Sequence, residues 1–259
     1  MPGGNRDSSK TRVAPVFDRL RGRSDDWVRD LLGLARHGSG AVVPAAADLS
    51  FHAGCWGSTE RALEPPVALL SWLIRNLTEP VGATQINEER SRLLAGDPSA
   101  ITLALQLLRS AGTGGGWHVF EGPSYPDAYI ETPDAVVVVE GKRTERHPTT
   151  HTTWMAGRHQ IWRHIDAAWE ARGRRAVFGL VLVEGADPDP FEVPSAWQEA
   201  TALALSAEAL RGSFPHRSDE ERSAIAQSLL GVATWQAVCR RFGVDFATLP
   251  RTTAELGAY

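Results

Sequence analysis

A run of four valines, Val136 to Val139, constrains the fold of this chain more than any other feature. Successive side chains of a strand point to opposite faces, so four apolar residues in a row need apolar surroundings on both sides. Residues 175–185, RAVFGLVLVEG, have the same two-sided apolar character. Strands buried on both faces are typical of a sheet that lies between layers of helices. We therefore expect an α/β protein.

Hydrophobic periodicity and turn residues predict the other elements. Pro65 and Pro66 suit the first turn of one helix, Asn87 is a suitable N-cap for a second, and Ser99 and Gly112 bound a third. Residues 49–66 have the character of a loop. From residue 84 the predicted order is α, β, β, β, α, β. We expect helices at 16–20, 27–34, 67–77, 88–96, 99–111 and 152–173, and strands at 117–122, 127–132, 135–143 and 175–185.

Four segments are expected along the chain: a disordered tail at 1–12, an N-terminal helical segment at 13–83, a core at 84–185 and a C-terminal helical segment at 186–259. Within the last segment, the proline-rich stretch 187–194 is a linker and 196–210 is a helix. Ser218 and Glu221 form the capping box of a further helix. Residues 229–244 are only weakly similar to a helix-turn-helix.

Composition excludes several classes of protein. No stretch approaches the roughly 20 apolar residues of a membrane helix, and the start MPGGNRDSSKTR lacks the apolar centre of a signal peptide. Cys55 and Cys239 supply neither a disulfide framework nor a zinc site. We therefore expect a cytoplasmic protein that does not bind a membrane. The formal net charge of −4 argues against a basic surface over the whole chain.

The stretch 125–143, YPDAYIETPDAVVVVEGKR, holds the groups best suited to chemistry. If its two strands form a hairpin, the residue numbers of paired positions sum to about 266 or 267. The register of 267 places Asp127 opposite Glu140, and Lys142 shares the face of Glu140 because side chains alternate. Two carboxylates and an ammonium group then converge at one end of a poorly hydrated strand.

Like charges opposite each other destabilise a sheet, so this arrangement needs a compensating charge. Mg²⁺ binds through one or two carboxylates, keeps several waters and leaves positions for phosphate oxygens. Mn²⁺ can substitute for it. Lys142 can then orient or deprotonate a metal-bound water, or balance charge on a phosphate in the transition state. The pattern therefore indicates hydrolysis of a phosphodiester.

Pro126-Asp127, twelve residues, and Glu140-Gly141-Lys142 resemble the motif of the PD-(D/E)XK nuclease superfamily. The resemblance covers residues 87–184. It implies a restriction-endonuclease-like αβββαβ core with a mixed sheet, flanked by the terminal helical segments. It also implies that Asp127, Glu140 and the carbonyl of Gly141 bind Mg²⁺ and that Lys142 is catalytic.

Many such nucleases are similar in carrying a Q-x-x-x-Y motif on the next helix, which implies a catalytic role for Gln160. His164 stands where that motif has tyrosine, four residues from Gln160 and on the same side of the helix. The family also commonly has an acidic residue on the helix before the sheet. Glu89 is the better candidate metal ligand there, because it shares a face with Ile86 and Leu93.

Structural roles remain as alternatives for each of these residues. Asp134, which also follows a proline, lies six strand residues from Glu140, about 20 Å at roughly 3.3 Å each, and is expected to form the turn. Glu89 can simply favour the start of a helix, Gln160 can be an ordinary polar residue, and His164 can be a hydrogen-bonded interior histidine. Asp127, Glu140 and Lys142 can form an ion-pair cluster at the end of a sheet.

Residues 140–175 carry eight lysines and arginines against four acidic residues, which is a locally basic stretch in an acidic chain. We expect this stretch to bind a nucleic-acid backbone, unless it is merely a solvated helix. The terminal helices are left to contact a second copy of the chain or a partner protein. The candidate substrate-binding residues are Arg143, Arg158, Arg163 and His164.

Three functions follow from these observations. The first is a Mg²⁺-dependent DNA endonuclease of restriction, repair or phage-defence type. The second is a nuclease of the same fold that acts on RNA or on strand ends. The third is a noncatalytic interaction protein with a residual acidic site, which the complete set of Asp127, Glu140 and Lys142 disfavours.

Overall fold

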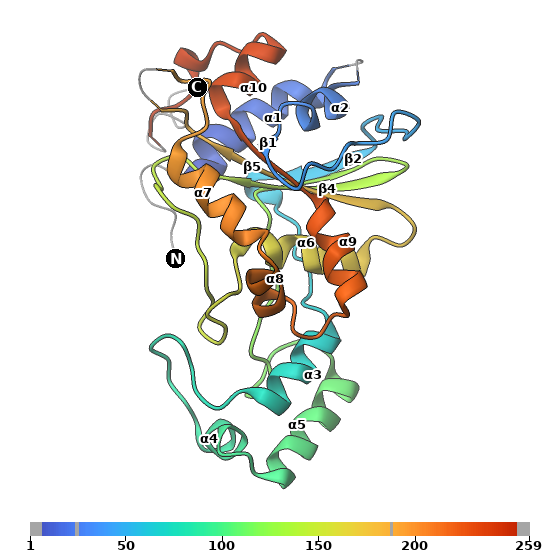
Figure 1. The fold of residues 1–259 in the computed structure, drawn as a ribbon, viewed down its shortest axis with the longest axis vertical. Helices are drawn as coiled ribbons and strands as arrows, with labels where there is room; N and C mark the ends of the chain where they lie inside the picture. Colours follow the sequence, from blue (N-terminus) through green and yellow to red (C-terminus); the bar gives the residue numbers. More distant parts are fainter. Residues whose placement is uncertain (1–6, 24–25, 187–188, 253–259) are drawn as a thin grey trace.

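The structure, a computed structural model, describes residues 7–23, 26–186 and 189–252. In these residues a mixed sheet lies between two layers of helices, and a helical lobe projects from one side (Figure 1). The α/β class expected from the valine run is confirmed. The helical lobe lies away from the sheet, at the opposite end of the long axis from α10 (Trp235–Phe242).

Six strands of the described residues pair in the order β1-β6-β5-β4-β3-β2. Three of them, β2, β3 and β4, form an antiparallel meander, whereas β4, β5 and β6 are parallel and β1 closes the far edge in antiparallel orientation. Their bounds are β1 Arg36–His37, β2 Ala53–Trp56, β3 Ala128–Glu131, β4 Ala135–Gly141, β5 Ala176–Val183 and β6 Leu229–Thr234.

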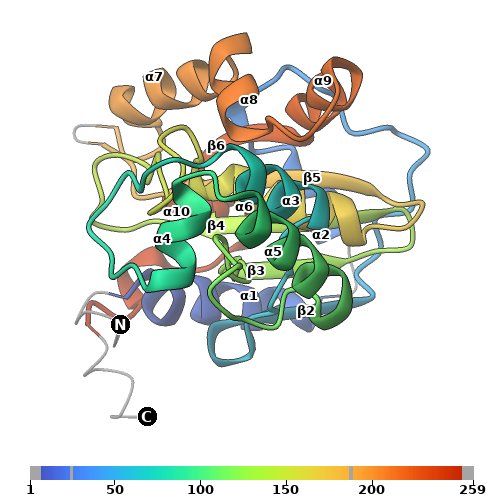
Figure 2. The ribbon, with the colours of Figure 1, turned by 90° about the horizontal axis from the view of Figure 1, so that it is seen from below.

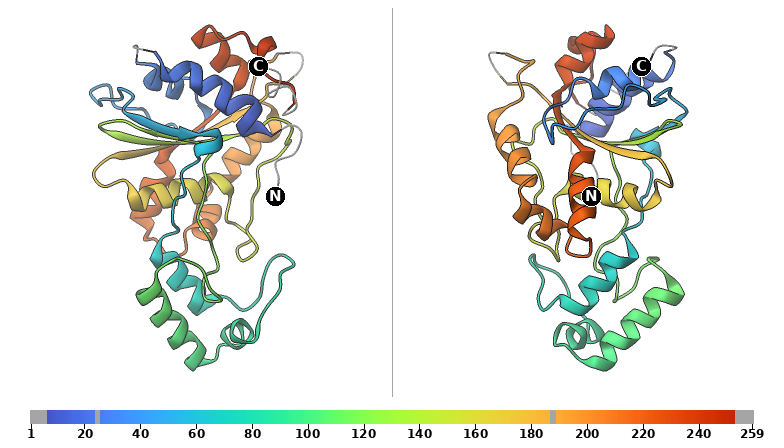
Figure 3. Two further views of the ribbon diagram at one scale, coloured as in Figure 1. Left: turned by 180° about the vertical axis from the view of Figure 1, so that it is seen from behind. Right: turned by 45° about the vertical axis from the view of Figure 1, so that its right-hand side comes forward.

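Strand β4 shows why both faces of the sheet must be covered. Val137 and Val139 pack into a core with α1 (Ala14–Arg21), α2 (Trp27–Leu32) and α10. Val136 and Val138 pack on the other face, under α6, α7, α8 and α9, and Figure 3 shows the two layers on opposite sides of the sheet. These four helices span α6 Gln160–Ala171, α7 Ser195–Ala204, α8 Ala207–Ser213 and α9 Asp219–Ser228. Glu140 belongs to the face that α6 covers.

The helical lobe consists of α3 (Val67–Asn76), α4 (Glu88–Leu94) and α5 (Pro98–Ala111), which share a separate apolar core. It is inserted between β2 and β3, and Figure 2 shows it from below, in front of the sheet. Asn87 caps α4 as predicted, because its side chain accepts a hydrogen bond from the Arg90 N–H. Gly112 ends α5 with a φ of +65°, whereas Asp97 rather than Ser99 caps its start.

The first strand of the meander was misplaced by the sequence pattern. The described residues 117–122 are irregular, and Phe120 belongs to the core of the lobe instead of the sheet. The strand is β2, inside the expected loop 49–66, where Ala53, Gly54 and Cys55 have little strand propensity. An edge strand of four residues leaves almost no periodic signal.

Three other expectations are corrected. The helix expected at 152–173 begins only at Gln160, because Trp154 and Met155 pack into the core of the lobe. The helix expected at 196–210 is interrupted, and Ser206 caps a new helix, α8. Residues 229–234 are strand β6, which excludes a helix-turn-helix at 229–244, whereas the capping box of Ser218 and Glu221 is present.

The expected segment boundaries also change. Residues 1–6 of the expected tail lie outside the described residues, but residues 9–13 form a π-helix, η1, with Thr11 and Arg12 buried. The N-terminal segment supplies β1 and β2, and the C-terminal segment supplies β6, so the sheet draws on all three segments after the tail. Asp187 of the linker lies outside the described residues. Among the described helices, none combines the length and apolar character needed to cross a membrane.

Gly179 sets the distance between α6 and the sheet. A Cβ atom at this position would lie 2.4 Å from Cδ1 and 2.8 Å from Cγ1 of Ile165, which is fully buried on α6. The absence of a side chain at Gly179 therefore lets α6 approach β5 and brings its first turn to the end of β4.

Gly179→Ala should lower the free energy of unfolding by about 1–3 kcal/mol, because the added methyl group overpacks the contact with Ile165. Gly212→Ala on α8 is the control, since a Cβ there meets only an ordinary contact at 3.9 Å. Urea denaturation measures both variants. Equal stabilities would show that α6 does not rest on Gly179.

Candidate active site

The β3–β4 hairpin brings the two predicted carboxylates together. Its paired positions sum to 267, as in Ala128 opposite Val139, so the structure has the second of the two registers expected. Asp127 stands immediately before β3, and its Oδ2 accepts a hydrogen bond of 2.7 Å from the Gly141 N–H. Gly141 cannot carry a side chain without displacement, because a Cβ would lie 2.7 Å from Val13 Cγ2 and 3.0 Å from Trp235 Cζ2.

Glu140 is held on both oxygens. Its Oε1 lies 2.7 Å from Lys142 Nζ, and its Oε2 lies 2.8 Å from His164 Nε2. Only 3% of Glu140 is exposed, so this carboxylate depends on its two partners to offset desolvation. Lys142 Nζ also donates a hydrogen bond of 3.1 Å to Gln160 Oε1. The four residues form one connected group at the carboxyl end of β4 and the first turn of α6.

The protein treats the two carboxyl groups differently. Burial raises the pKa of Asp127 to about 8, and the negative charge of Glu140 adds to this effect. Burial also acts to raise the pKa of Glu140, but His164 and Lys142 outweigh it and the pKa is lowered. Burial acts to lower the pKa of Lys142, but the negative charge of Glu140 has the larger effect, and the pKa of Lys142 is raised. In the metal-free protein near neutral pH, Glu140 and Lys142 are therefore charged and Asp127 is protonated.

A hard divalent cation fits the donors of this site. Asp127 and Glu140 offer carboxylate oxygens, and a cation between them would replace the proton that Asp127 holds. Among the described residues, no group of three or more His, Cys, Asp or Glu side chains could hold a metal ion. Two carboxylates are enough for Mg²⁺, because this ion keeps several waters in its coordination shell and does not need a full set of protein ligands.

Glu89 is not brought to this group. It is exposed on α4, in the helical lobe, whereas Asp127 and Glu140 lie at the sheet (Figure 1). The structure therefore favours its alternative role as a first-turn acid of a helix. Asp134 stands in the turn of the hairpin, as expected, and accepts a hydrogen bond of 2.7 Å from the Asp48 N–H.

Three of the four candidate substrate-binding residues are not available to a substrate. Arg158 is fully buried between Glu121 and Asp166, at 2.8 and 2.9 Å. Arg143 has a side chain that is 9% exposed and contacts Glu184 at 3.2 Å. His164 is 2% exposed. Carboxylates outside the basic stretch thus neutralise much of its charge, and Arg163, with a side chain 26% exposed, is the candidate that remains accessible.

Ser124 and Glu60 also reach this region, although neither was a sequence candidate. The Ser124 hydroxyl contacts His164 Nδ1, so the chain Ser124, His164, Glu140 is continuous. Glu60 follows β2, whose Trp56 pairs with Ala128, and its charge makes a small contribution to the raised pKa of Asp127. Glu60 lies in the stretch 49–66, which was expected to be a loop, so the sequence held no signal for it.

The chain Ser124, His164, Glu140 resembles the connectivity of a serine hydrolase triad. Ser124 is only 3% exposed, however, and a nucleophile must reach its substrate. The two ring nitrogens of His164 lie within hydrogen-bond distance of Glu140 and of the Ser124 hydroxyl, so the ring is fixed between them. We therefore assign His164 and Ser124 to orienting Glu140.

No protein-family model, curated protein or solved structure matches this chain.

Asp127→Asn should change how stability depends on pH in the presence of EDTA. The pKa of about 8 in the folded protein exceeds the ordinary value of 3.8, so the unfolded chain releases this proton first. The free energy of unfolding of the wild type should fall between about pH 4 and pH 8, by up to about 1.4 kcal/mol per pH unit from this group. The variant lacks this contribution.

Chemical denaturation at pH 5, 6, 7 and 8 measures the effect. The stability of Asp127→Asn relative to wild type should increase with pH, whereas Asp134→Asn, in the same hairpin, should follow the wild type. Parallel curves for all three proteins would contradict the raised pKa of Asp127.

Arg158→Met should destabilise the protein by about 3–5 kcal/mol, because it leaves the buried Glu121 with only the more distant Arg163, at 3.7 Å, and takes one of the cations away from the buried Asp166. Arg174→Met is the matched control, since Arg174 is exposed beyond the end of α6. Thermal and urea denaturation would detect the difference. A stable Arg158→Met variant that binds nucleic acid weakly would restore the role first expected for Arg158.

Proposed function

We propose that this protein is a Mg²⁺-dependent nuclease of the PD-(D/E)XK superfamily that hydrolyses phosphodiester bonds in DNA. One observation carries the proposal: the register of the hairpin brings Asp127, Glu140 and Lys142 together as the motif requires. Lys142 also donates a hydrogen bond to Gln160. A restriction, repair or phage-defence endonuclease is the class that fits. Cleavage of RNA or of strand ends by the same site is the alternative.

The order of elements around the site supports the proposal. A helix, three meandering strands, a helix and a parallel strand occur in the order α1, β2, β3, β4, α6 and β5, with α2 and β1 between α1 and β2 and with the helical lobe inserted after β2. If α2 and β1 are left out, this order is compatible with the αβββαβ order implied by the motif, with α1 and β2 in place of the elements expected at 88–122. The insertion explains why the first two elements stand so far from the motif in sequence.

Each residue of the site has a separate role in the proposed reaction. Asp127, Glu140 and the carbonyl of Gly141 would hold the metal ion, with Mn²⁺ as a substitute for Mg²⁺. A bound metal ion polarises the phosphoryl group and lowers the pKa of a coordinated water. Lys142 supplies a fixed positive charge beside the phosphate, where negative charge develops. Gln160 orients the Lys142 ammonium, and His164 keeps one oxygen of Glu140 turned toward α6.

The contacts of Lys142 favour charge stabilisation over proton transfer. Its ammonium group lies 2.7 Å from Glu140, which raises its pKa and keeps it protonated. A general base must lose its proton near the working pH. We therefore place Lys142 as the group that stabilises the transition state.

Replacing either carboxylate should abolish metal-dependent cleavage. Purified wild type, Asp127→Asn, Glu140→Gln and Asp134→Asn are incubated with Mg²⁺ and circular duplex, linear duplex, single-stranded DNA or RNA. We expect cleavage by the wild type and Asp134→Asn, and a loss of at least a hundredfold in the other two, since each lacks a metal ligand. Cleavage by Asp127→Asn or Glu140→Gln at the wild-type rate would reject the site.

The same substrates separate the second and third functions. Cleavage of RNA alone, or release of single nucleotides from linear ends, would move the protein to the RNA or strand-end class. A wild type that binds these substrates in Mg²⁺ or Mn²⁺ but cleaves none would support a noncatalytic protein, whose partners would contact the terminal helices.

Lys142→Ala should bind Mg²⁺ or Mn²⁺ in isothermal titration but cleave at least a hundredfold more slowly, because it removes charge without removing a metal ligand. Lys142→Arg should restore little activity, since the planar guanidinium places its charge differently. Gln160→Ala, which only loosens Lys142, should lose less than Lys142→Ala. Near-normal turnover in Lys142→Arg would show that positive charge alone is sufficient.

A further inference from the structure

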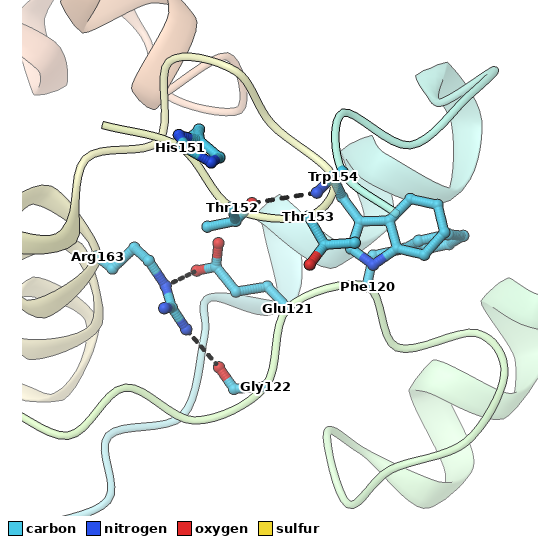
Figure 4. Close-up of a pocket in the computed structure, with 9 residues that line it drawn as sticks. Phe120, Glu121, Gly122, His151, Thr152, Thr153, Trp154 and Arg163 are labelled. Atoms are coloured by element: carbon cyan, nitrogen blue, oxygen red, sulfur yellow. Dashed lines mark hydrogen bonds and ion pairs between the residues drawn. The ribbon is translucent and has the colours of Figure 1, made fainter. Parts of the chain in front are cut away.

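A cavity of about 430 Å³ lies between α6 and the helical lobe. Figure 4 shows Arg163 and Glu121 on one side of it, Trp154 and Phe120 on the other, and the loop with His151 and Thr152 above. Ligand cavities commonly have volumes of about 300–1,000 Å³. The cavity is therefore large enough for a small group such as one nucleotide.

Arg163 gives this cavity a positive charge that is paired only loosely, with Glu121. Its buried Nε has no hydrogen-bond partner among the described residues, and the nearest Glu121 oxygen is 3.7 Å away. Glu121 directs both oxygens to Arg158, at 3.1 and 2.8 Å. Nη2 of Arg163 donates only a long hydrogen bond of 3.4 Å to the Gly122 carbonyl. The guanidinium can therefore donate a hydrogen bond to an anionic oxygen without breaking a short ion pair.

The opposite wall is aromatic. Phe120 and Trp154 pack edge to face with ring centroids 4.9 Å apart, and Arg90 lies over both rings at 5.1 Å. His151 is exposed at the rim, and Thr152 is half-buried beside it. Both Phe120 and Trp154 are largely buried, at 4% and 7% exposure, so this wall is apolar, and Arg163 opposite it is the group suited to a phosphate.

The cavity adjoins the proposed catalytic group through α6 and through the chain before β3. Arg163 stands three residues after Gln160, about 4.5 Å along the helix axis. Gly122 stands two residues before Ser124, which contacts His164. A strand with one phosphate at Asp127 and Glu140 can therefore extend into the cavity.

We propose that this cavity binds the phosphate of an unpaired nucleotide in the strand to be cleaved, with Arg163 as its cation. The inference depends on the proposed function, and it narrows the substrate class. A cavity of this size takes one nucleotide and not a base pair, so the substrate is single-stranded at this point. The phosphate is either an internal diester or a terminal monoester.

Binding without cleavage tests the proposal. Fluorescence anisotropy with Ca²⁺ in place of Mg²⁺ compares wild type, Arg163→Gln, Arg163→Lys and the exposed control Arg174→Gln. The probes are a labelled 12-nucleotide single strand, with and without a 5′-phosphate, and a blunt duplex. Arg163→Gln should bind the single strand at least tenfold more weakly and lower its log–log salt slope by about 0.7. Arg163→Lys should lose less, and Arg174→Gln should match wild type.

The source of the phosphate follows from the two single strands. Equal binding indicates an internal diester, and tighter Arg163-dependent binding of the phosphorylated strand indicates a terminal monoester. Unchanged affinity in a folded Arg163→Gln variant would overturn the proposal. An equal loss for the blunt duplex would overturn the assignment to an unpaired nucleotide.

These experiments distinguish failure of the nuclease proposal from failure of the cavity proposal. If no substrate is cleaved but binding still depends on Arg163, the cavity is a nucleotide site without the proposed catalysis. If cleavage occurs and binding is independent of Arg163, the catalytic site stands and the cavity has no such role.

Discussion

The register of the β3–β4 hairpin is the constraint on which the candidate site depends. It sets Asp127 opposite Glu140 and directs Glu140 and Lys142 toward α6. A slip of one residue would turn Glu140 and Lys142 to the face covered by α1 and α10, away from Gln160. Such a slip is unfavourable, because it would move the Glu140 carboxylate into the apolar core that holds Val139. The stability of the sheet and the geometry of the site therefore have the same source.

Charge within the site is unevenly compensated. Glu140 has Lys142 and His164, whereas Asp127 has one backbone N–H and an opposing carboxylate. The metal-free protein relieves the repulsion by keeping a proton on Asp127, which burial favours. A divalent cation removes the need for that proton. The fold thus tolerates a locally unfavourable arrangement at the place where we propose metal binding.

Features that depend on near neighbours could be predicted from the sequence. The hairpin register, the cap at Asn87 and the capping box of Ser218 follow from local periodicity and turn chemistry. The burial of Arg158 could not be predicted, because its partner Glu121 lies in the stretch expected to be a strand. Helical periodicity predicts on which side of a helix a residue lies. Whether an arginine on that side is exposed depends on carboxylates that are distant in the sequence. The weak edge strand β2 likewise forms because β3 offers it a partner.

Anomalous diffraction from crystals grown or soaked with Mn²⁺ tests the central claim most directly. We expect a peak about 2.0–2.3 Å from an oxygen of Asp127 and from an oxygen of Glu140, within range of the Gly141 carbonyl. The peak should be absent from crystals of Glu140→Gln. A well-ordered wild-type site with no peak at saturating Mn²⁺, or a peak held by other residues, would contradict a metal-dependent active site at the end of β4.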